Sequence, residues 1–261
     1  MSSSPSLPIT IAPARSPTDT YLISALENKV FYDDPFSIVA FGPERGSSAN
    51  IEERARGLER MSGGRSESQE EKEWGVIEKA TLSGGEREEG EVVGAAAWRF
   101  VVGREGENEG SGRDGDVVKG SGESLEDKKE DGGVEKGEKK HSWGIGANVK
   151  FCEDVFLVAD EHMICSTKGR DYAKLFTLIV SPSHQRRGIG TQLLESGLRE
   201  VDKLGLQCVL AASKEGVGLY ERFGFVETHR MSLRLWEYEG GEGLGEEMHV
   251  VMRRPAKSLE N

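Results

Sequence analysis

The sequence lacks several features that would assign it to a well-defined class of protein. It has three cysteines, Cys152, Cys165 and Cys208. An odd number without close C-x-x-C spacing argues against a disulfide framework or a structural zinc site, so we expect buried or half-buried free thiols in a reducing compartment. The first eight residues contain neither a basic cluster nor an apolar run, so no secretory signal is expected. No apolar run approaches the length of a membrane span.

Positive charges are outnumbered by negative ones, 34 to 46, and apolar residues are scarce. The formal net charge is −12, which disfavours nucleic acid as a partner. Apolar residues make up 36% of the chain, less than is usual for a globular domain, while charged residues reach 31% and glycines number 34. This composition predicts a folded core diluted by disordered sequence. We expect a cytoplasmic protein, with the nucleus as an alternative, that binds neither nucleic acid nor a membrane.

One internal stretch accounts for much of this unusual composition. Residues 103–140 are rich in Gly, Glu, Lys, Asp and Ser and hold too few apolar side chains to offset the entropy of ordering. We predict a disordered insertion within a single domain spanning residues 7–254, with flexible termini at 1–6 and 255–261. A regulatory or partner-binding segment is the alternative. Residues 102–142 contain twelve acidic and eight basic residues, so they supply −4 of the −12, and the remaining −8 favours cationic substrates.

Hydrophobic periodicity predicts the secondary structure outside this insertion. The strand–helix–strand unit over 174–212 must be parallel with a right-handed crossover, and the strands at 74–82 and 92–101 are expected to form a hairpin. The result is an α+β fold whose mixed, mostly antiparallel sheet is flanked by helices. Strands are predicted at 9–11, 74–82, 92–101, 174–180, 207–212, 225–236 and 248–253, and helices at 16–30, 49–61, 151–163, 190–203 and 216–223.

A glycine-bearing turn follows the apolar strand at 174–180 and opens a helix. The first backbone N–H groups of a helix have no intrahelical partner, and the helix dipole favours negative charge there. Gly188 and Gly190 lack Cβ atoms, so the backbone can approach a pyrophosphate closely. Arg186 and Arg187 add cationic donors beside it.

Two common phosphate-binding motifs do not fit this turn. A Walker A loop ends in G-K-[ST], whereas Gly190 is followed by Thr191 and Gln192. A dinucleotide fingerprint counted from Gly188 requires glycine or alanine where Leu193 stands. Taken alone, the run is equally compatible with a plain helix start and with an anion site.

The sequence around the turn resembles a known family. The apolar strand followed by Gln185-Arg186-Arg187-Gly188-Ile189-Gly190 resembles the Q/R-x-x-G-x-G/A motif of the GNAT superfamily of acyl-CoA N-acyltransferases. Downstream, Leu219-Tyr220 followed by Gly224-Phe225 resembles the L-Y-x-x-x-G-F motif of the same family. The resemblance is closest over 175–226, looser over 9–40 and 92–99, and absent from 103–140. The segments 33–36 and 94–98 also look like fungal GNAT-like proteins.

The resemblance implies a GNAT fold and direct acyl transfer from acetyl-CoA to a primary amine, with no acyl-enzyme and no metal. The family has a bulge that splays the strand at 175–180 from the next strand. The pantetheine arm then pairs with the freed strand, whose backbone N–H groups become the oxyanion donors. The cofactor-binding residues implied are Leu178, Ile179, Val180, Arg186, Arg187, Gly188, Ile189, Gly190, Thr191, Ser213 and Tyr220.

Tyr220 is the catalytic residue that the resemblance implies, as general acid or sulfur-orienting contact. A thiol titrates near ~8.5 and a phenol near ~10, so the proton transfer is modestly uphill in water and reasonable in a dry site. Without the resemblance, Tyr220 would be interpreted as a core aromatic. Gln185 is expected to cap the loop, and Cys208 to pack in the core.

A general base for the amine is harder to find. Some family members carry a glutamate in the central strand, where this sequence offers apolar residues and Thr177, which puts a dedicated carboxylate base in doubt. Asp171, Tyr172, Glu78 and His229 are alternatives, each with a structural or solvated role as the preferred interpretation.

The acceptor is expected to be a small-molecule amine. The alternatives are a protein N-terminus or lysine, or a catalytically weak scaffold that binds acyl-CoA. Trp98, Phe36 and Phe31 are candidates to line an acceptor pocket, with core packing as the default for each.

Overall fold

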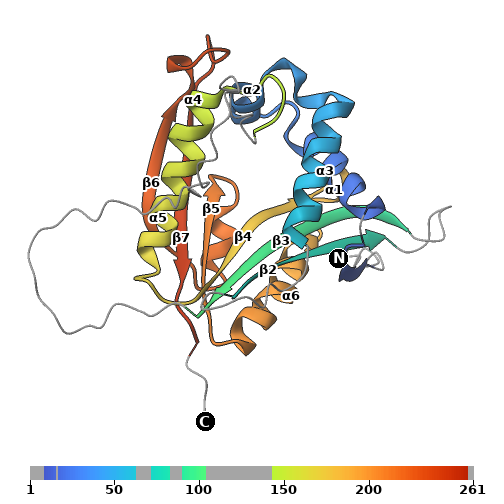
Figure 1. The fold of residues 1–261 in the computed structure, drawn as a ribbon, viewed down its shortest axis with the longest axis vertical. Helices are drawn as coiled ribbons and strands as arrows, with labels where there is room; N and C mark the ends of the chain where they lie inside the picture. The colour runs from blue at the N-terminus through green and yellow to red at the C-terminus, as the bar shows by residue number, and fades with distance from the viewer. Residues whose placement is uncertain (1–8, 16, 63–71, 83–89, 104–142, 258–261) are drawn as a thin grey trace, which may run out of the picture.

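The computed structural model describes residues 9–15, 17–62, 72–82, 90–103 and 143–257. Its strands form one seven-stranded sheet in the order β1-β2-β3-β4-β5-β7-β6 (Figure 1). Only the β4–β5 pair is parallel, which confirms the predicted mixed, mostly antiparallel sheet. The strands are β1 (Ile9–Pro13), β2 (Lys72–Leu82), β3 (Glu91–Val102), β4 (Tyr172–Val180), β5 (Gln207–Ser213), β6 (Val226–Arg234) and β7 (Glu246–Arg254).

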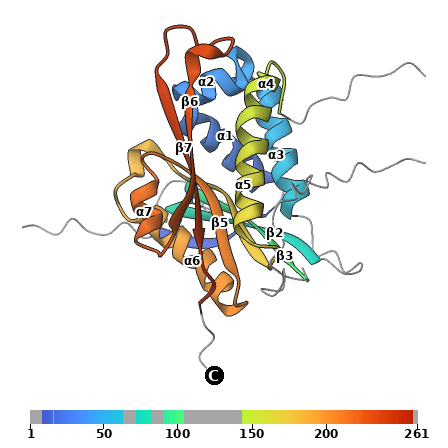
Figure 2. The same ribbon diagram turned by 90° about the vertical axis from the view of Figure 1, so that its left-hand side faces the viewer.

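Helices cover both faces of this sheet (Figures 1 and 2). One face, here the α6 face, is covered by α6 and α7. The other, here the α1 face, carries α1 and α3 over β2 and β3, and α5 over β5, β6 and β7. The helices are α1 (Thr18–Phe31), α2 (Pro35–Phe41), α3 (Ser48–Ser62), α4 (Val149–Cys152), a π-helical turn (Glu153–Leu157), α5 (Val158–Ser166), α6 (Ile189–Lys203) and α7 (Val217–Glu221).

A short helix that the sequence pattern did not predict follows residue 34. A seven-residue helix, α2, begins there, because Asp34 caps it by accepting a hydrogen bond from the Ser37 backbone N–H at 3.0 Å. Pro35 occupies the first helical position, where its missing N–H costs nothing. The helix is too short to show a clear periodicity, which is why the sequence pattern did not reveal it.

Some predictions fall outside the described residues. These are most of the connection between the expected hairpin strands at 74–82 and 92–101, and all of the 103–140 insertion except Gly103. Most of the two predicted flexible termini also lie there. The β2–β3 hairpin and the parallel β4–β5 pair are confirmed.

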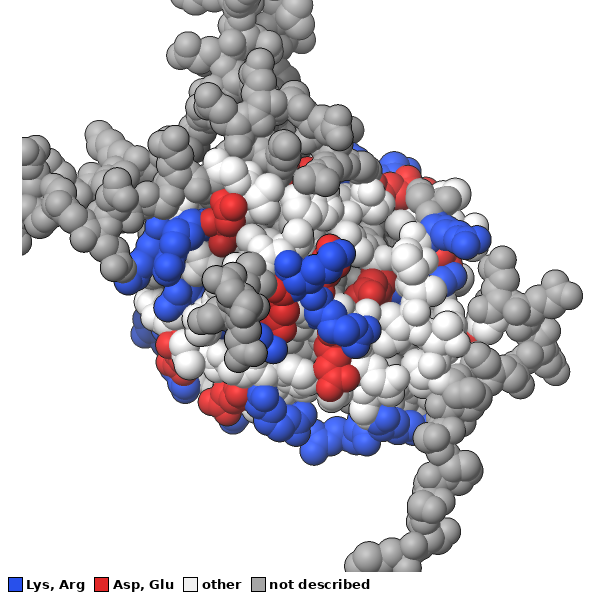
Figure 3. Space-filling view, turned by 90° about the horizontal axis from the view of Figure 1, so that it is seen from below, with Lys and Arg blue, Asp and Glu red and all other residues white. Residues whose placement is uncertain are grey.

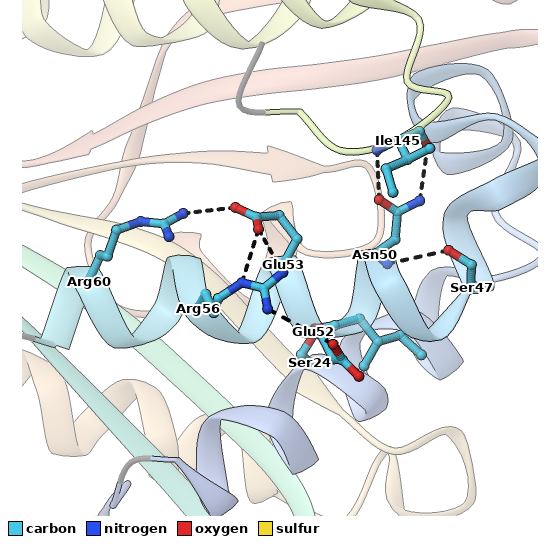
Figure 4. Close-up of polar contacts among 9 residues, drawn as sticks. Ser24, Ser47, Asn50, Glu52, Glu53, Arg56, Arg60 and Ile145 are labelled. Atoms are coloured by element: carbon cyan, nitrogen blue, oxygen red, sulfur yellow. Dashed lines mark hydrogen bonds and ion pairs between the residues drawn. The ribbon is translucent and has the colours of Figure 1, made fainter. Parts of the chain in front are cut away.

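The helix predicted at 49–61 corresponds to α3, and ion pairs between Glu and Arg side chains run along its outer surface (Figure 4). Glu53 accepts hydrogen bonds from Arg56 at 3.0 Å and from Arg60 at 3.2 Å. At the start of the same helix, the Asn50 side chain accepts from the Ile145 N–H at 2.7 Å and donates to the Ile145 carbonyl at 2.9 Å. The first turn of α3 therefore fixes the chain just before α4.

Charge is not segregated on the face seen from below the view of Figure 1. Lys and Arg side chains are interspersed there with Asp and Glu (Figure 3). The net negative charge is therefore not gathered into one acidic surface on this side, and local contacts must decide which substrates bind. Among the helices of the described residues, none has the length and apolar character needed to cross a bilayer.

An ion pair joins the end of α6 to β7. Arg254 is 5% exposed and donates to both carboxylate oxygens of Asp202, at 2.6 and 3.0 Å, and its Nε donates to the Phe223 carbonyl at 2.9 Å. Burial opposes ionisation of Asp202, but hydrogen bonds from Arg254 and Lys257 outweigh it and lower the Asp202 pKa. The pair therefore connects α6, the chain after α7, and β7.

Replacing Asp202 by asparagine is expected to lower the free energy of unfolding at pH 7 by about 1–2 kcal/mol, because buried Arg254 loses its charged acceptor. A lowered folded-state pKa gives stability that is present above the unfolded value of about 3.9 and is lost as pH falls through the folded value. The difference in unfolding free energy between wild type and D202N should therefore narrow as pH falls below about 3.9. Urea unfolding at pH 7 and pH 3 measures this. The control is E200Q, which removes an exposed ion pair with Lys203. An equal loss of unfolding free energy in the two variants at pH 7 would contradict the prediction.

Candidate active site

The site begins where β4 and β5 separate. Their parallel pairing covers only Tyr172–Lys174 against Gln207–Val209. On the other side of β4, Ala97 of β3 pairs with Thr177 whereas Trp98 pairs with Leu175, so one extra residue, Phe176, is inserted. Such a bulge bends its strand away from regular pairing. The bulge and the separation expected from the family resemblance are both present.

Hydrogen bonds around β4 show which backbone groups face this opening. The Ser181 N–H donates to a β3 carbonyl at 2.8 Å, and N–H groups alternate in direction along a strand. The backbone N–H and C=O groups of Ile179 therefore face β3, and the backbone N–H and C=O groups of Leu178 and Val180 face the opening. The Val180 carbonyl accepts from the Gln185 side chain at 3.2 Å, so Gln185 caps the loop as expected. The N–H groups of Leu178 and Val180 are the donors that line the opening.

The loop after β4 presents its backbone to open space. Arg186 and Gly188 both have positive φ, at 60° and 80°. This conformation is strained for arginine and is why glycine is needed at position 188. A Cβ on Gly188 would meet no atom within 4 Å, and Arg186 and Arg187 are exposed. Ile189 is 2% exposed and anchors the start of α6. The loop thus offers helix N–H groups and two guanidinium groups to an anion.

The remaining predicted loop and strand-end residues lie nearby. Gly190 is in the first turn of α6, where a Cβ would lie 3.6 Å from a Val180 methyl group, an ordinary contact. Thr191 follows it and is half-buried. Ser213 is exposed at the end of β5, and its carbonyl accepts from the Gly216 N–H at 3.0 Å. Ser213 therefore starts the turn that leads into α7.

Tyr220 of α7 lies on the α6 face and interacts with Cys208 of β5, which is in the short stretch where β5 still pairs with β4. It is 9% exposed and packs edge-to-face on Phe225 at 5.7 Å between ring centroids. Burial raises the pKa of Tyr220, and the neighbouring Cys208 adds to the rise. Burial also raises the pKa of Cys208, while a hydrogen bond from the Leu175 backbone opposes it. At neutral pH the phenol is therefore a protonated donor, and the thiol is too buried and too weakly acidic to act as a nucleophile.

On the α1 face, a carboxylate that the sequence pattern did not reveal reaches β4. Glu27 of α1 accepts a hydrogen bond from the Thr177 hydroxyl at 3.1 Å. Arg54 of α3 donates to the same carboxylate from Nε at 2.6 Å and from a terminal nitrogen at 2.9 Å. Burial raises the pKa of Glu27, but the charge and hydrogen bonds of Arg54 and the bond from Thr177 outweigh it and lower the pKa. Glu27 is 150 residues away from Thr177, so no local spacing could pair them.

The four alternative bases occupy other places. Glu78 faces α6, where it accepts from the Ser196 hydroxyl at 2.6 Å. His229 of β6 stacks on His162 of α5 with ring centroids 3.5 Å apart. Asp171 and Tyr172 lie at the start of β4, where it is still paired with β5. Of the carboxylates named so far, Glu27 is the one hydrogen-bonded to Thr177.

A cavity of about 160 Å³ lies on the α1 face beside the bulge, between the sheet and α5. The Phe176 ring forms part of its wall, with the Lys174 ammonium 4.2 Å and the Arg99 guanidinium 4.9 Å from the ring centroid. Arg99 pairs with Glu73 at 2.7 Å, and Lys174 pairs with Asp160. Charges of both signs thus line a space whose wall includes Phe176, the residue before Thr177. The lining residues are Glu73, Arg99, Val101, Asp160, Met163, Ile164, Tyr172, Lys174, Phe176 and Val209.

The aromatic residues considered for an acceptor pocket have different environments. Trp98 is fully buried on the α6 face, where Gly197 of α6 packs against its ring, so it belongs to the core. Phe36 packs on Phe151 at 5.1 Å and stacks on His249 at 5.5 Å. Phe31 is 38% exposed.

The cysteine prediction is correct for two of the three thiols. Cys152 and Cys208 are buried, but Cys165 is exposed, because it lies on the outward side of α5. The expectation of a buried or half-buried thiol is therefore wrong for Cys165.

Comparisons with known proteins agree with this geometry. A sequence model described as an acetyltransferase (GNAT) domain matches residues 153–234. The chain is 39% identical over 62 residues to the [ribosomal protein bS18]-alanine N-acetyltransferase of Escherichia coli strain K12. It is 35% identical over 79 residues to the protein of the same description from Salmonella typhimurium. These matches cover 22% and 28% of this chain, and 42% and 53% of the relatives. The chain thus spans about half the length of the curated relatives it matches.

Solved structures share this fold. An arylalkylamine N-acetyltransferase like 5b from mosquito superposes with a TM-score of 0.54 at 14% identity, covering 95% of this chain and 99% of its own. A protein described as histone acetyltransferase HPA2 and related acetyltransferase, from Corynebacterium glutamicum, gives 0.52 at 17% identity, covering 95% and 97%. At these identities the likeness shows the fold alone. The resemblance of residues 33–36 and 94–98 to fungal proteins gains no support from these matches.

Proposed function

Since this chain carries an acetyltransferase domain of the GNAT family, we propose that it transfers an acetyl group from acetyl-CoA to the primary amine of a small molecule. The separation of β4 from β5 beside the glycine loop is the observation that carries this proposal. The exposed loop backbone and Arg186 and Arg187 fit a pyrophosphate. The unpaired edge of β4 fits a pantetheine arm that binds as an added strand.

The opening carries groups suited to the proposed acyl transfer. As the C–N bond forms, the thioester carbonyl oxygen gains negative charge, and the N–H groups of Leu178 and Val180 are the donors proposed to stabilise it. As the C–S bond breaks, Tyr220 donates its phenolic hydrogen to the sulfur. The raised pKa of Tyr220 keeps the phenol protonated at neutral pH, so this donor is always present.

Replacing Tyr220 by phenylalanine should lower kcat more than it raises the Kd for acetyl-CoA. A hydrogen bond to a charged group contributes about 1.5–3 kcal/mol, which predicts a loss of about 10- to 150-fold in kcat. Steady-state thiol release and calorimetry measure the two quantities. F225L is the control, because it alters the ring packed on Tyr220 and leaves the hydroxyl in place. An unchanged kcat in Y220F would remove Tyr220 from the chemistry.

Thiol release from acetyl-CoA with a panel of amines tests the proposed function. The panel should hold ethylamine, phenethylamine, spermidine, a peptide with a free N-terminus and an N-blocked peptide containing lysine. Turnover with the small amines supports the proposal. Turnover confined to a peptide would favour the second candidate function, acetylation of a protein N-terminus or lysine. That candidate is motivated by the matched relatives, which are described as acting on an alanine of a ribosomal protein.

A scaffold without catalysis is distinguished by calorimetry. Acetyl-CoA binding with no thiol release for any amine would favour the weakly catalytic alternative. Absence of acetyl-CoA binding would contradict the proposal as a whole.

A further inference from the structure

We propose that Thr177 and Glu27 form a proton relay that takes the proton from the attacking amine: the amine N–H passes its proton to the Thr177 hydroxyl, which passes its own proton to Glu27. This inference rests on the proposed acetyltransferase function and adds to it the general base that the sequence did not provide.

The bulge decides where the Thr177 side chain points. Neighbouring residues of a regular strand point to opposite faces of the sheet, but an inserted residue breaks this alternation. Phe176 lines the cavity beneath α5 and Thr177 bonds to Glu27 of α1, so both side chains point to the α1 face. Thr177 therefore lies in the unpaired part of β4 and directly follows Phe176, which lines the cavity of about 160 Å³ in which the proposal places the acceptor.

Helices α1 and α3 hold the carboxylate of Glu27 in one orientation. Two hydrogen bonds from Arg54, at 2.6 and 2.9 Å, fix both oxygens. One of these oxygens also accepts the Thr177 hydroxyl at 3.1 Å. Because this hydroxyl gives its hydrogen to Glu27, the lone pairs of the Thr177 oxygen remain as acceptors for an amine N–H. A threonine in the strand and a glutamate from a helix thus provide a carboxylate base that acts through the threonine hydroxyl.

Every bond and proton is accounted for in the proposed reaction. The amine enters as the free base, its lone pair forms the C–N bond, and the C–S bond breaks. One proton leaves the nitrogen for the Thr177 oxygen while the Thr177 hydroxyl proton moves to Glu27. Tyr220 supplies the proton that the sulfur gains, then recovers one from solvent, and Glu27 returns its proton to solvent. The products are the amide and CoA thiol.

The pairing with Arg54 limits when this relay can act. Arg54 keeps Glu27 ionised and makes it a weak base, which cannot deprotonate a free alkylammonium with a pKa near ~10. The nitrogen becomes acidic only as it gains positive charge during C–N bond formation. The relay therefore assists the bond-forming step, in which Thr177 is the catalytic residue and Glu27 its positioning residue and final proton acceptor.

The test compares T177V, E27Q, the double variant and T177S with the most active amine of the panel above. T177V and E27Q should each lower kcat about 100-fold, as loss of a general base does. The double variant should lose no more than either single variant, because both interrupt one chain. T177S keeps the hydroxyl and should stay within about threefold of wild type. The solvent deuterium isotope effect on kcat should be normal in wild type and smaller in T177V.

Binding and folding measurements separate this relay from a structural role. The Kd for acetyl-CoA, measured by calorimetry, should be unchanged in T177V. This variant keeps the Glu27–Arg54 pair, so it tests the relay even if E27Q fails to fold. E53Q is the matched control, because Glu53 also pairs with arginines but on the exposed side of α3, and it should keep full activity.

Wild-type kcat in T177V would overturn the relay, as would T177S as slow as T177V or a weakened Kd for acetyl-CoA in T177V. Each of these leaves the acetyltransferase proposal standing. Absence of turnover by wild type with every amine would overturn both.

Discussion

Replacing Gly188 by aspartate is expected to raise the Kd for acetyl-CoA at least about 100-fold, a loss of about 2.7 kcal/mol or more. The new side chain would enter open space, since no atom lies within 4 Å of a Cβ at this position. It would therefore not collide with the protein. Its carboxylate would stand at the start of α6, where the proposed pyrophosphate places its own negative charges. Isothermal calorimetry with acetyl-CoA measures the change.

Two variants separate the charge effect from backbone strain. Gly188 has φ of 80°, so any side chain there is strained. Gly243 has φ of 81° and equally open surroundings in the loop between β6 and β7. G243D should show a similar small loss of stability with no loss of affinity, and G188A should fall between wild type and G188D. If G188D bound acetyl-CoA as tightly as wild type, the loop would not be the pyrophosphate site.

Replacing Gly197 by alanine should cause the largest loss of stability among these variants, about 3 kcal/mol or enough to prevent folding. A Cβ there would lie 2.1–2.4 Å from three ring atoms of Trp98. Trp98 is fully buried between β3 and α6, so its ring has no space into which to move. The helix would have to shift away from the sheet and carry the glycine loop with it.

Gly218 provides the control for this effect. It lies in α7, where a Cβ would meet nothing within 4 Å, and alanine is preferred to glycine in a helix. G218A should be neutral or slightly stabilising in urea unfolding. Equal stability of G197A and G218A would show that α6 does not pack as closely on Trp98 as the structure describes.

The sequence alone predicted the sheet order only in part but identified most elements around the site. Strong apolar runs and glycine turns are local signals, so β4, α6, β5 and the loop between β4 and α6 could be read from the pattern. The short helix α2 was missed because seven residues give little periodicity. Whether Trp98 lines a pocket or belongs to the core was decided by packing, because a tryptophan in a strand is equally compatible with both.

Local sequence specifies the chemistry within single segments: a glycine turn suited to an anion, a tyrosine on a short helix, and a strand without a carboxylate. The packing of the whole fold sets how distant segments meet. It inserted Phe176 as a bulge, turned Thr177 toward α1, and brought Glu27, which Arg54 holds, to Thr177 across 150 residues of chain. Strand register and helix packing set these contacts, and both depend on the whole sheet rather than on spacing along the sequence.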